Sequence, residues 1–196
     1  DSTANEQKGR RAVTIRSDGG TMEDVTLDGL YIHDINGWNP KSNNGAAISF
    51  GAKGQTYIDG LTIENCLIKD VTRDGITGGG YTGTRPWGWN SWDKQDGVLR
   101  HKNVVIRNNV LDTIAGDGIV PGGTYEVLVE HNLVSHASNN PTPYPNMSGN
   151  AKSNLSAAVW PFDADNSIFQ YNEVCYTGVP RGTEVADGEA FDSDYY

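Results

Sequence analysis

The amino-acid sequence predicts an all-β solenoid, a fold in which short strands stack coil upon coil. Residues 61–65, 104–108 and 127–131 repeat one pattern, in which apolar and polar residues alternate and an Asn or His closes the run. A second element, Asp followed by Gly, recurs at residues 74–75, 117–118 and 187–188. Strands this short cannot each bury an apolar face alone, so they must stack on their neighbours.

The spacing of the repeats gives the size of one coil. Val129 lies 23 positions after Ile106, which suits three short strands and three turns. The other intervals are 43 and 41 residues, and the excess lies in segments rich in Gly, Pro and Asn. We expect two of these insertions, residues 77–103 and 138–156, to project from the same side and wall a groove. The inward-facing pairs that should stack are Leu61/Ile63, Val104/Ile106 and Val127/Val129.

The composition fits one domain of this kind. The chain has 196 residues with 24 Gly and 8 Pro, which suits a single solenoid domain over residues 1–196 that is rich in turns. Its net charge of −10 argues against a nucleic-acid partner. Its apolar runs are shorter than the roughly 18–20 residues of a membrane span. The chain starts at Asp1 and ends in what should be another coil, so we expect a segment truncated at one or both ends of a longer solenoid.

Asparagines close several of the repeated strands. Asn tolerates left-handed backbone geometry and can satisfy the polar groups of a turn. We therefore expect a stacked structural ladder at this corner. Its predicted members are Asn65, Asn108, His131 and Asn172.

The coil pattern and the segments 156–165 (SAAVWPFDAD) and 187–194 (DGEAFDSD) resemble right-handed parallel β-helix proteins of the pectate-lyase-like superfamily. The resemblance covers nearly the whole chain. It implies a right-handed parallel β-helix, a polysaccharide or oligosaccharide partner, and secretion to the extracellular or periplasmic space. It implies no single reaction, because that superfamily includes hydrolases, lyases and adhesins.

Acidic residues gather in the last third of the chain. Asp163 and Asp165 follow Trp160 closely. About one coil later come Asp187, Glu189, Asp192 and Asp194. Glycoside hydrolysis needs two carboxyl groups, one to protonate the leaving oxygen and one to attack carbon or activate water. We expect Asp163 and Asp187 to face the surface, with Trp160 raising the pKa of one acid.

The Asp-Gly corners add carboxylates to the same face. Asp74 and Asp117 should stack about 5 Å apart, the spacing of neighbouring strands. Like charges this close repel, so one of them should take up a proton or a cation. A capping role in a sharp turn is the alternative for both residues. The candidate catalytic residues are Asp117, Asp163, Asp165, Asp187 and Glu189.

Aromatic residues supply candidate sugar-binding surfaces. Three tryptophans stand within six residues on the polar insertion, where a loop offers little interior to bury them. Flat aromatic faces can stack on sugar rings, and packing within the loop is the alternative. The candidate substrate-binding residues are Trp87, Trp89, Trp92 and Trp160.

Two other functions remain open. A polysaccharide lyase needs a cation such as Ca²⁺ at a uronate carboxylate and a basic residue to remove a proton. The basic candidates are Arg73, Arg85, Arg100, Lys102 and Arg181. The acidity of the chain repels uronates unless Ca²⁺ intervenes, so hydrolysis without a cofactor is the leading hypothesis. A non-catalytic glycan-binding or surface module is the third possibility, and the acid cluster is then a calcium site or a solvated rim.

Overall fold

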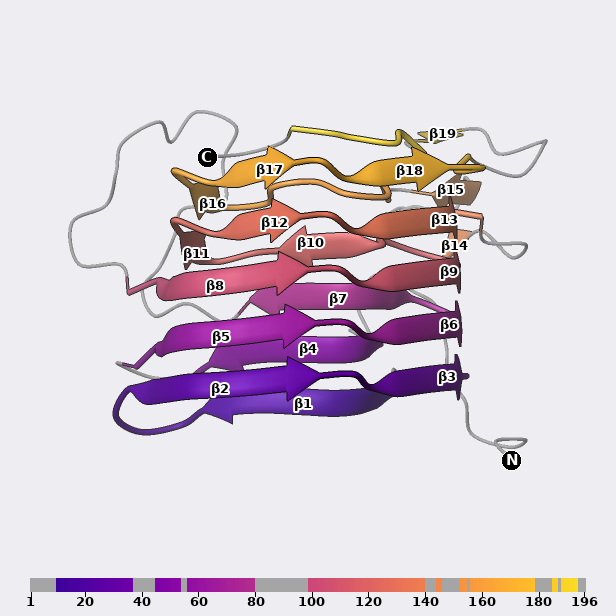
Figure 1. Ribbon diagram of the computed structural model, residues 1–196. Helices are drawn as coiled ribbons and strands as arrows, with labels where there is room; N and C mark the ends of the chain where they lie inside the picture. The colour runs from indigo at the N-terminus through magenta and orange to yellow at the C-terminus, as the bar shows by residue number, and fades with distance from the viewer. Residues whose placement is uncertain are drawn as a thin grey trace.

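The computed structural model describes residues 10–36, 45–53, 56–79, 99–139, 144–145, 152–154, 156–178, 185–186 and 188–193. This part of the chain is all-β and contains no helix, and hence none that could span a membrane. Its strands stack into three parallel sheets, which confirms the predicted parallel β-helix (Figure 1). Much of the two insertions expected to wall a groove, including residues 80–98, lies outside the described residues, so their placement stays a prediction.

The chain passes through the three sheets in turn in each coil, and the later coils give sheet 2 two short strands each. Sheet 1 contains, in order, β1 (Arg11–Ser17), β4 (Ala46–Ala52), β7 (Asp74–Gly79) and β10 (Ile119–Pro121). Sheet 2 contains β2 (Met22–Asp28), β5 (Ile58–Glu64), β8 (His101–Arg107), β11 (Thr124–Tyr125), β12 (Leu128–Glu130), β16 (Ala164–Asp165) and β17 (Ile168–Gln170). Sheet 3 contains β3 (Tyr31–Ile35), β6 (Leu67–Val71), β9 (Val110–Ile114), β13 (Leu133–Ala137) and β18 (Glu173–Cys175).

The third side of the coil lies behind the other two. In Figure 1, sheets 2 and 3 continue into one another at the front, and sheet 1 runs behind them. A small additional sheet joins β14 (Tyr144–Pro145), β15 (Lys152–Asn154) and β19 (Val185–Ala186), with β14 antiparallel to β15. Every other strand pairing in the described part is parallel.

The core consists of apolar columns that run along the solenoid axis. Leu61 pairs with Val104, and Ile63 pairs with Ile106, which in turn pairs with Val129. These side chains are fully buried, as is almost all of Val127. The predicted stacking of the three inward-facing pairs is therefore confirmed, because a parallel register repeats the period-two alternation of each strand in the next coil.

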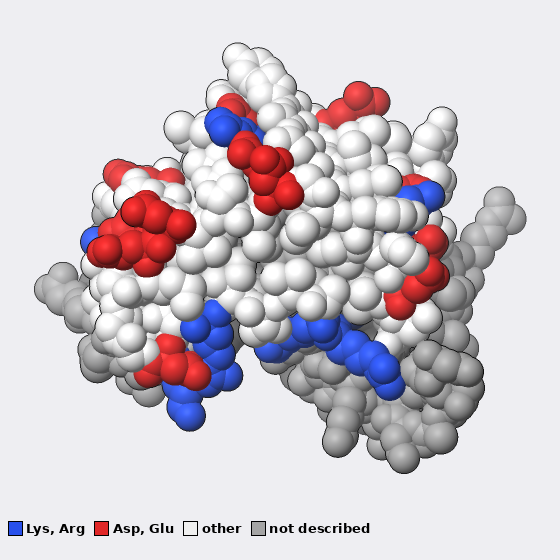
Figure 2. Space-filling view, turned by 60° about the horizontal axis from the view of Figure 1, so that its bottom comes forward, with Lys and Arg blue, Asp and Glu red and all other residues white. Residues whose placement is uncertain are grey.

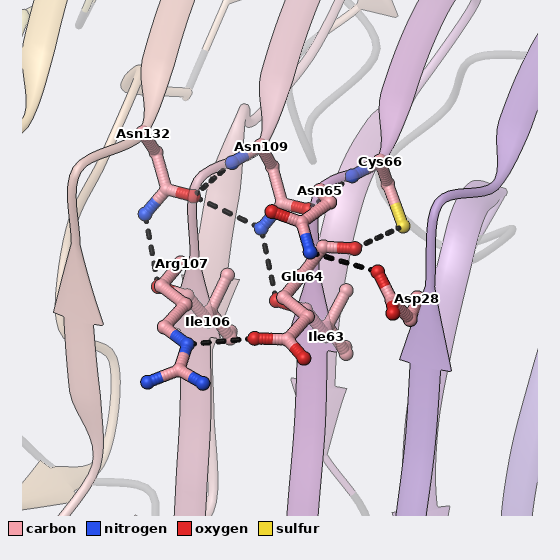
Figure 3. A network of polar contacts seen from close by, with 9 residues as sticks. All are labelled: Asp28, Ile63, Glu64, Asn65, Cys66, Ile106, Arg107, Asn109 and Asn132. Atoms are coloured by element: carbon pink, nitrogen blue, oxygen red, sulfur yellow. Dashed lines mark hydrogen bonds and ion pairs between the residues drawn. The ribbon is translucent and has the colours of Figure 1, made fainter.

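A ladder of buried asparagine side chains supports the corner between sheets 2 and 3 (Figure 3). Oδ1 of Asn109 accepts the backbone N–H of Cys66, and Oδ1 of Asn132 accepts that of Asn109, each at 3.0 Å. Asn172 continues the series by accepting the N–H of Asn132 at 3.0 Å. Each amide nitrogen also donates to a carbonyl of an earlier coil. The ladder thus satisfies turn groups that the strands cannot reach.

The prediction for this ladder was right for Asn172 and wrong for its other members. Asn65, Asn108 and His131 lie one residue before the ladder position, are exposed, and have φ values of 55°, 55° and 53°. Their left-handed backbone bends the chain so that the next residue points inward. The corner therefore uses two adjacent residues, one for the bend and one for the hydrogen bonds.

Replacing Asn132 by Ala should destabilise the fold by roughly 2–4 kcal/mol. The change leaves the N–H of Asn109 and the carbonyl of Ile106 buried without a side-chain partner. Urea denaturation followed by circular dichroism measures the loss. Asn108→Gly is the matched control, because Gly adopts the exposed left-handed corner without strain. A loss for Asn132→Ala no larger than that of the control would contradict the role of the ladder.

The charged residues are spread unevenly over the surface. Figure 2 shows the face that includes the N-terminal coil, with Asp and Glu in separate groups around it, larger groups of Lys and Arg along its lower side, and smaller ones beside the acids. The excess of acid in the composition therefore does not form one continuous acidic surface on this face.

Candidate active site

The Asp-Gly corners begin at the same position in neighbouring coils of sheet 1. The register of β7 and β10 aligns Asp74 with Asp117, and the N–H of Asp117 donates to Oδ1 of Asp74 at 3.2 Å. The coils approach so closely here that a Cβ on Gly118 would lie 2.3 Å from the carbonyl oxygen of Ala158. Only Gly fits at that position, which explains why Asp-Gly recurs in the sequence.

Arg73 lies between the two corner carboxylates. Its Nη1 is 2.8 Å from Oδ1 of Asp74, and its Nη2 is 3.3 Å from Oδ2 of Asp117. All three side chains are buried. Burial raises the pKa of Asp74 to about 7, an effect that Arg73 reduces and Asp117 increases. The corner therefore holds both a cation and, near neutral pH, a proton, as two stacked carboxylates require.

Trp160 packs over this corner on the outer side of sheet 1. Its indole Nε1–H donates to Oδ1 of Asp117 at 2.9 Å, and the N–H of Ala157 donates to the same oxygen at 3.0 Å. Val120 packs beside Trp160, and the ring of Phe162 meets it edge-on at 5.5 Å between centroids. The acid that accepts the indole N–H of Trp160 is therefore Asp117, whereas the sequence pattern suggested that Trp160 acts on the acids that follow it in the chain.

Asp163 and Asp165 share one arginine. Nη1 of Arg100 lies 2.5 Å from Oδ1 of Asp163, and its Nη2 lies 3.3 Å from Oδ2 of Asp165. Asp163 is 0% exposed and has a φ of 53°. The expectation that Asp163 faces the surface is therefore wrong, because its carboxylate is turned inward to a guanidinium. From the sequence, Arg100 was a candidate only for the base of a lyase. Its ion pair with Asp163 was not predicted, because the two residues lie 63 positions apart.

The next coil brings Glu189 and Asp192 to the same side of the solenoid. Val159 forms a parallel bridge with Phe191, so Asp192 lies beside Trp160 and Glu189 lies beside Ala157. Glu189 is exposed and Asp192 half-buried, with the N–H of Ser193 donating to Oδ1 of Asp192 at 2.7 Å. Asp192 belonged to the acid cluster seen in the sequence but not to the candidate catalytic set, because the register that places it next to Trp160 is visible only in the structure.

Of the remaining predicted site residues, one lies in the described part of the chain and the others lie outside it. Lys102 is exposed, with its ammonium 5.3 Å from the ring centre of Tyr57. Within the described part of the chain, no group of three or more His, Cys, Asp or Glu residues could hold a metal ion. The residues that lie outside the described part are Arg85, Trp87, Trp89, Trp92, Arg181, Asp187 and Asp194.

Comparisons with known proteins point to one group of enzymes. No family model matches the chain. The chain is 30% identical over 205 residues to a lacto-N-biosidase of Bifidobacterium longum subsp. longum, which covers 92% of this chain and 13% of that protein. It therefore spans about an eighth of the length of the curated relative that it matches.

The fold is found in two crystal structures of the GH136 lacto-N-biosidase from Eubacterium ramulus. The selenomethionine derivative has a TM-score of 0.73 at 21% identity and covers 100% of this chain and 34% of its own. The native protein has a TM-score of 0.73 at 22% identity and covers 95% and 33%. The assignment to the pectate-lyase-like superfamily was therefore wrong, because the proteins that the chain resembles in sequence and fold are lacto-N-biosidases.

Proposed function

We propose that the protein containing this chain is a glycoside hydrolase that cleaves the glycosidic bond joining lacto-N-biose to the rest of an oligosaccharide. The observation that carries the proposal is the 30% identity to a lacto-N-biosidase over 92% of the chain. The substrate expected is an oligosaccharide rather than a polysaccharide. Secretion follows as part of the proposal, since such glycans are met outside the cell.

The outer side of sheet 1 is the proposed sugar-binding surface. Phe162 is half-buried and packs against Trp160, of which 9% is exposed, and Val120 supports both rings from the coil below. Asp192 lies next to Trp160 in the coil above. An aromatic surface with adjacent carboxylates suits a sugar, whose ring has an apolar face and whose edges carry hydroxyl groups. Trp87, Trp89 and Trp92 remain proposed contributors from the insertion.

The acids of this surface differ in how many hydrogen bonds and ion pairs their carboxylate oxygens form. Asp117 accepts from an indole, a backbone N–H and a guanidinium, and Asp163 is buried against Arg100. Carboxylates held in this way suit the positioning of other groups better than proton transfer. Asp192 is less enclosed. We therefore assign the chemistry to Asp192 and its neighbours in the same segment, Asp187 and Glu189, and we assign Asp165, which pairs with Arg100, to positioning.

These acids have two tasks in glycoside hydrolysis. One carboxylic acid protonates the leaving oxygen, and a second carboxylate attacks the anomeric carbon or activates a water molecule. The lyase alternative loses two of its basic candidates, because Arg73 and Arg100 are already paired with carboxylates in the described part of the chain. A base that removes a proton must be free of such partners.

Hydrolysis can be tested with the full-length protein and a chromogenic lacto-N-bioside. We expect release of the chromophore together with lacto-N-biose, identified by chromatography against the authentic disaccharide. A panel containing uronate polysaccharides tests the lyase alternative in the same experiment. Unsaturated uronate products with no release of lacto-N-biose would contradict the proposal, as would binding of the glycan without any cleavage.

A further inference from the structure

Arg100 joins two coils at the end of the proposed sugar-binding surface. Its Nη1 reaches both Oδ1 and the backbone carbonyl of Asp163, at 2.5 and 2.9 Å, while its Nη2 reaches Asp165. The same carbonyl of Asp163 accepts the N–H groups of Gly123 and Thr124, at 3.0 and 3.2 Å. The turn that follows Phe162 is thus fixed by a guanidinium on one side and by two backbone donors on the other.

His101 fixes the backbone from which Arg100 projects. Its Nδ1 accepts the N–H of Ile58 at 3.1 Å, so its proton is on Nε2, which donates to the carbonyl of Gly79 at 3.0 Å. The ring is almost fully buried, and burial lowers the pKa of His101, which keeps the imidazole neutral. Arg100 therefore reaches Asp163 from a rigid support.

The turn at Asp163 sets the position of the two aromatic rings before it. Phe162 packs closely on the preceding coil, since a Cβ on Gly122 would lie 3.3 Å from its Cδ1. Trp160 contacts Phe162 edge-on and is held at its indole N–H by Asp117. One end of this aromatic pair is thus anchored by Asp117, and the other by the turn that Arg100 holds.

We propose that Arg100 is a positioning residue that holds Phe162, packed against the buried Trp160, in the orientation that binds the sugar. The inference rests on the proposed function and assigns Arg100 to substrate affinity rather than to chemistry. The planar fork of Arg can bind two carboxylates and a carbonyl together, whereas Lys offers a single point charge. Affinity should therefore depend on the fork and not only on the positive charge.

The test uses Arg100→Lys and Asp165→Asn in the full-length protein. Arg100→Lys keeps a cation beside the buried Asp163. Asp165→Asn weakens only the contact between Nη2 of Arg100 and the partly exposed Asp165. For each variant we expect KM for the lacto-N-bioside, and the Kd of lacto-N-biose by calorimetry, to rise roughly 3- to 30-fold, with kcat changed less than about twofold. Hydrogen exchange should be faster at the N–H groups of Gly123 and Thr124. Arg107→Lys is the control, because Arg107 pairs with Glu64 on the exposed face of sheet 2.

Two results would overturn the inference. One is an unchanged Kd and KM in both variants, and the other is a fall in kcat with KM unchanged. If the wild-type protein binds lacto-N-biose but does not hydrolyse the substrate, only the proposed function is wrong, since the Kd values still test the role of Arg100. A wild-type protein that neither binds nor hydrolyses overturns both.

Discussion

Replacing Asp192 by Asn should lower hydrolysis of a lacto-N-bioside roughly 10²- to 10⁴-fold, the usual loss when a general acid or base is removed. The same size of loss is expected for Asp187→Asn if it supplies the second carboxyl group. Asp192 lies beside Trp160 and is half-buried, and within the described part of the chain its carboxylate pairs locally with the N–H of Ser193. An isosteric amide should therefore leave the fold intact. The measurement is kcat and KM on the chromogenic substrate, with circular dichroism for the fold.

Two further variants separate chemistry from folding in this experiment. Asp70→Asn is the matched control, because Asp70 is exposed on sheet 3 and its φ of 54° is equally suited to Asn. Asp163→Asn should instead reduce stability, because it leaves Arg100 with a weakened buried partner. Full activity in both Asp187→Asn and Asp192→Asn would remove the two residues from the mechanism.

Replacing Asp74 by Asn should flatten the dependence of stability on pH between about pH 4 and pH 8. Asp74 has a pKa of about 7 in the folded protein because burial disfavours its charge, and about 3.9 when unfolded. As pH rises between these values, the unfolded chain loses the proton while the folded chain keeps it, so the free energy of unfolding falls. The total is on the order of 4 kcal/mol. Above pH 7 both states are ionised and the fall ends.

The comparison of Asp74→Asn with the wild type isolates this group from others that titrate. His101 acts in the opposite sense, because burial lowers its pKa and its contribution to stability is lost as pH falls. Urea denaturation of both proteins at several pH values gives the two curves. We expect the variant to be more stable than the wild type at pH 8. Parallel curves for the two proteins would contradict the account of the buried corner.

The fold could be predicted because each coil repeats the same alternation. The columns that run through Leu61 and Ile63 follow from period two and a parallel register alone. The ladder was harder, because the choice between Asn108 and Asn109 depends on which residue adopts the left-handed conformation, and Asn is suited to both positions. The sequence pattern therefore did not show that the ladder position lies one residue after the left-handed one.

The candidate site could be predicted only in part, for reasons that lie in contacts between coils. The repeated Asp-Gly element identified Asp74 and Asp117 as stacked carboxylates that need a proton or a cation. The partners of Asp163 could not be read from the sequence, since Arg100 lies 63 positions away and reaches it across an intervening turn. The family was mistaken for a similar reason, because stacked short strands with Asn and Gly corners are common to β-helices of many functions.

A crystal structure of the full-length protein with bound lacto-N-biose tests the central claim most directly. The claim is that the outer side of sheet 1, around Trp160, is where the protein binds and cleaves its sugar. The account predicts a sugar ring against Phe162 at the surface around Trp160, with the carboxylate of Asp192 within hydrogen-bonding distance of the sugar, about 2.6–3.2 Å. Lacto-N-biose bound elsewhere, for example on the exposed Tyr31 of sheet 3, with the surface around Trp160 free, would contradict it.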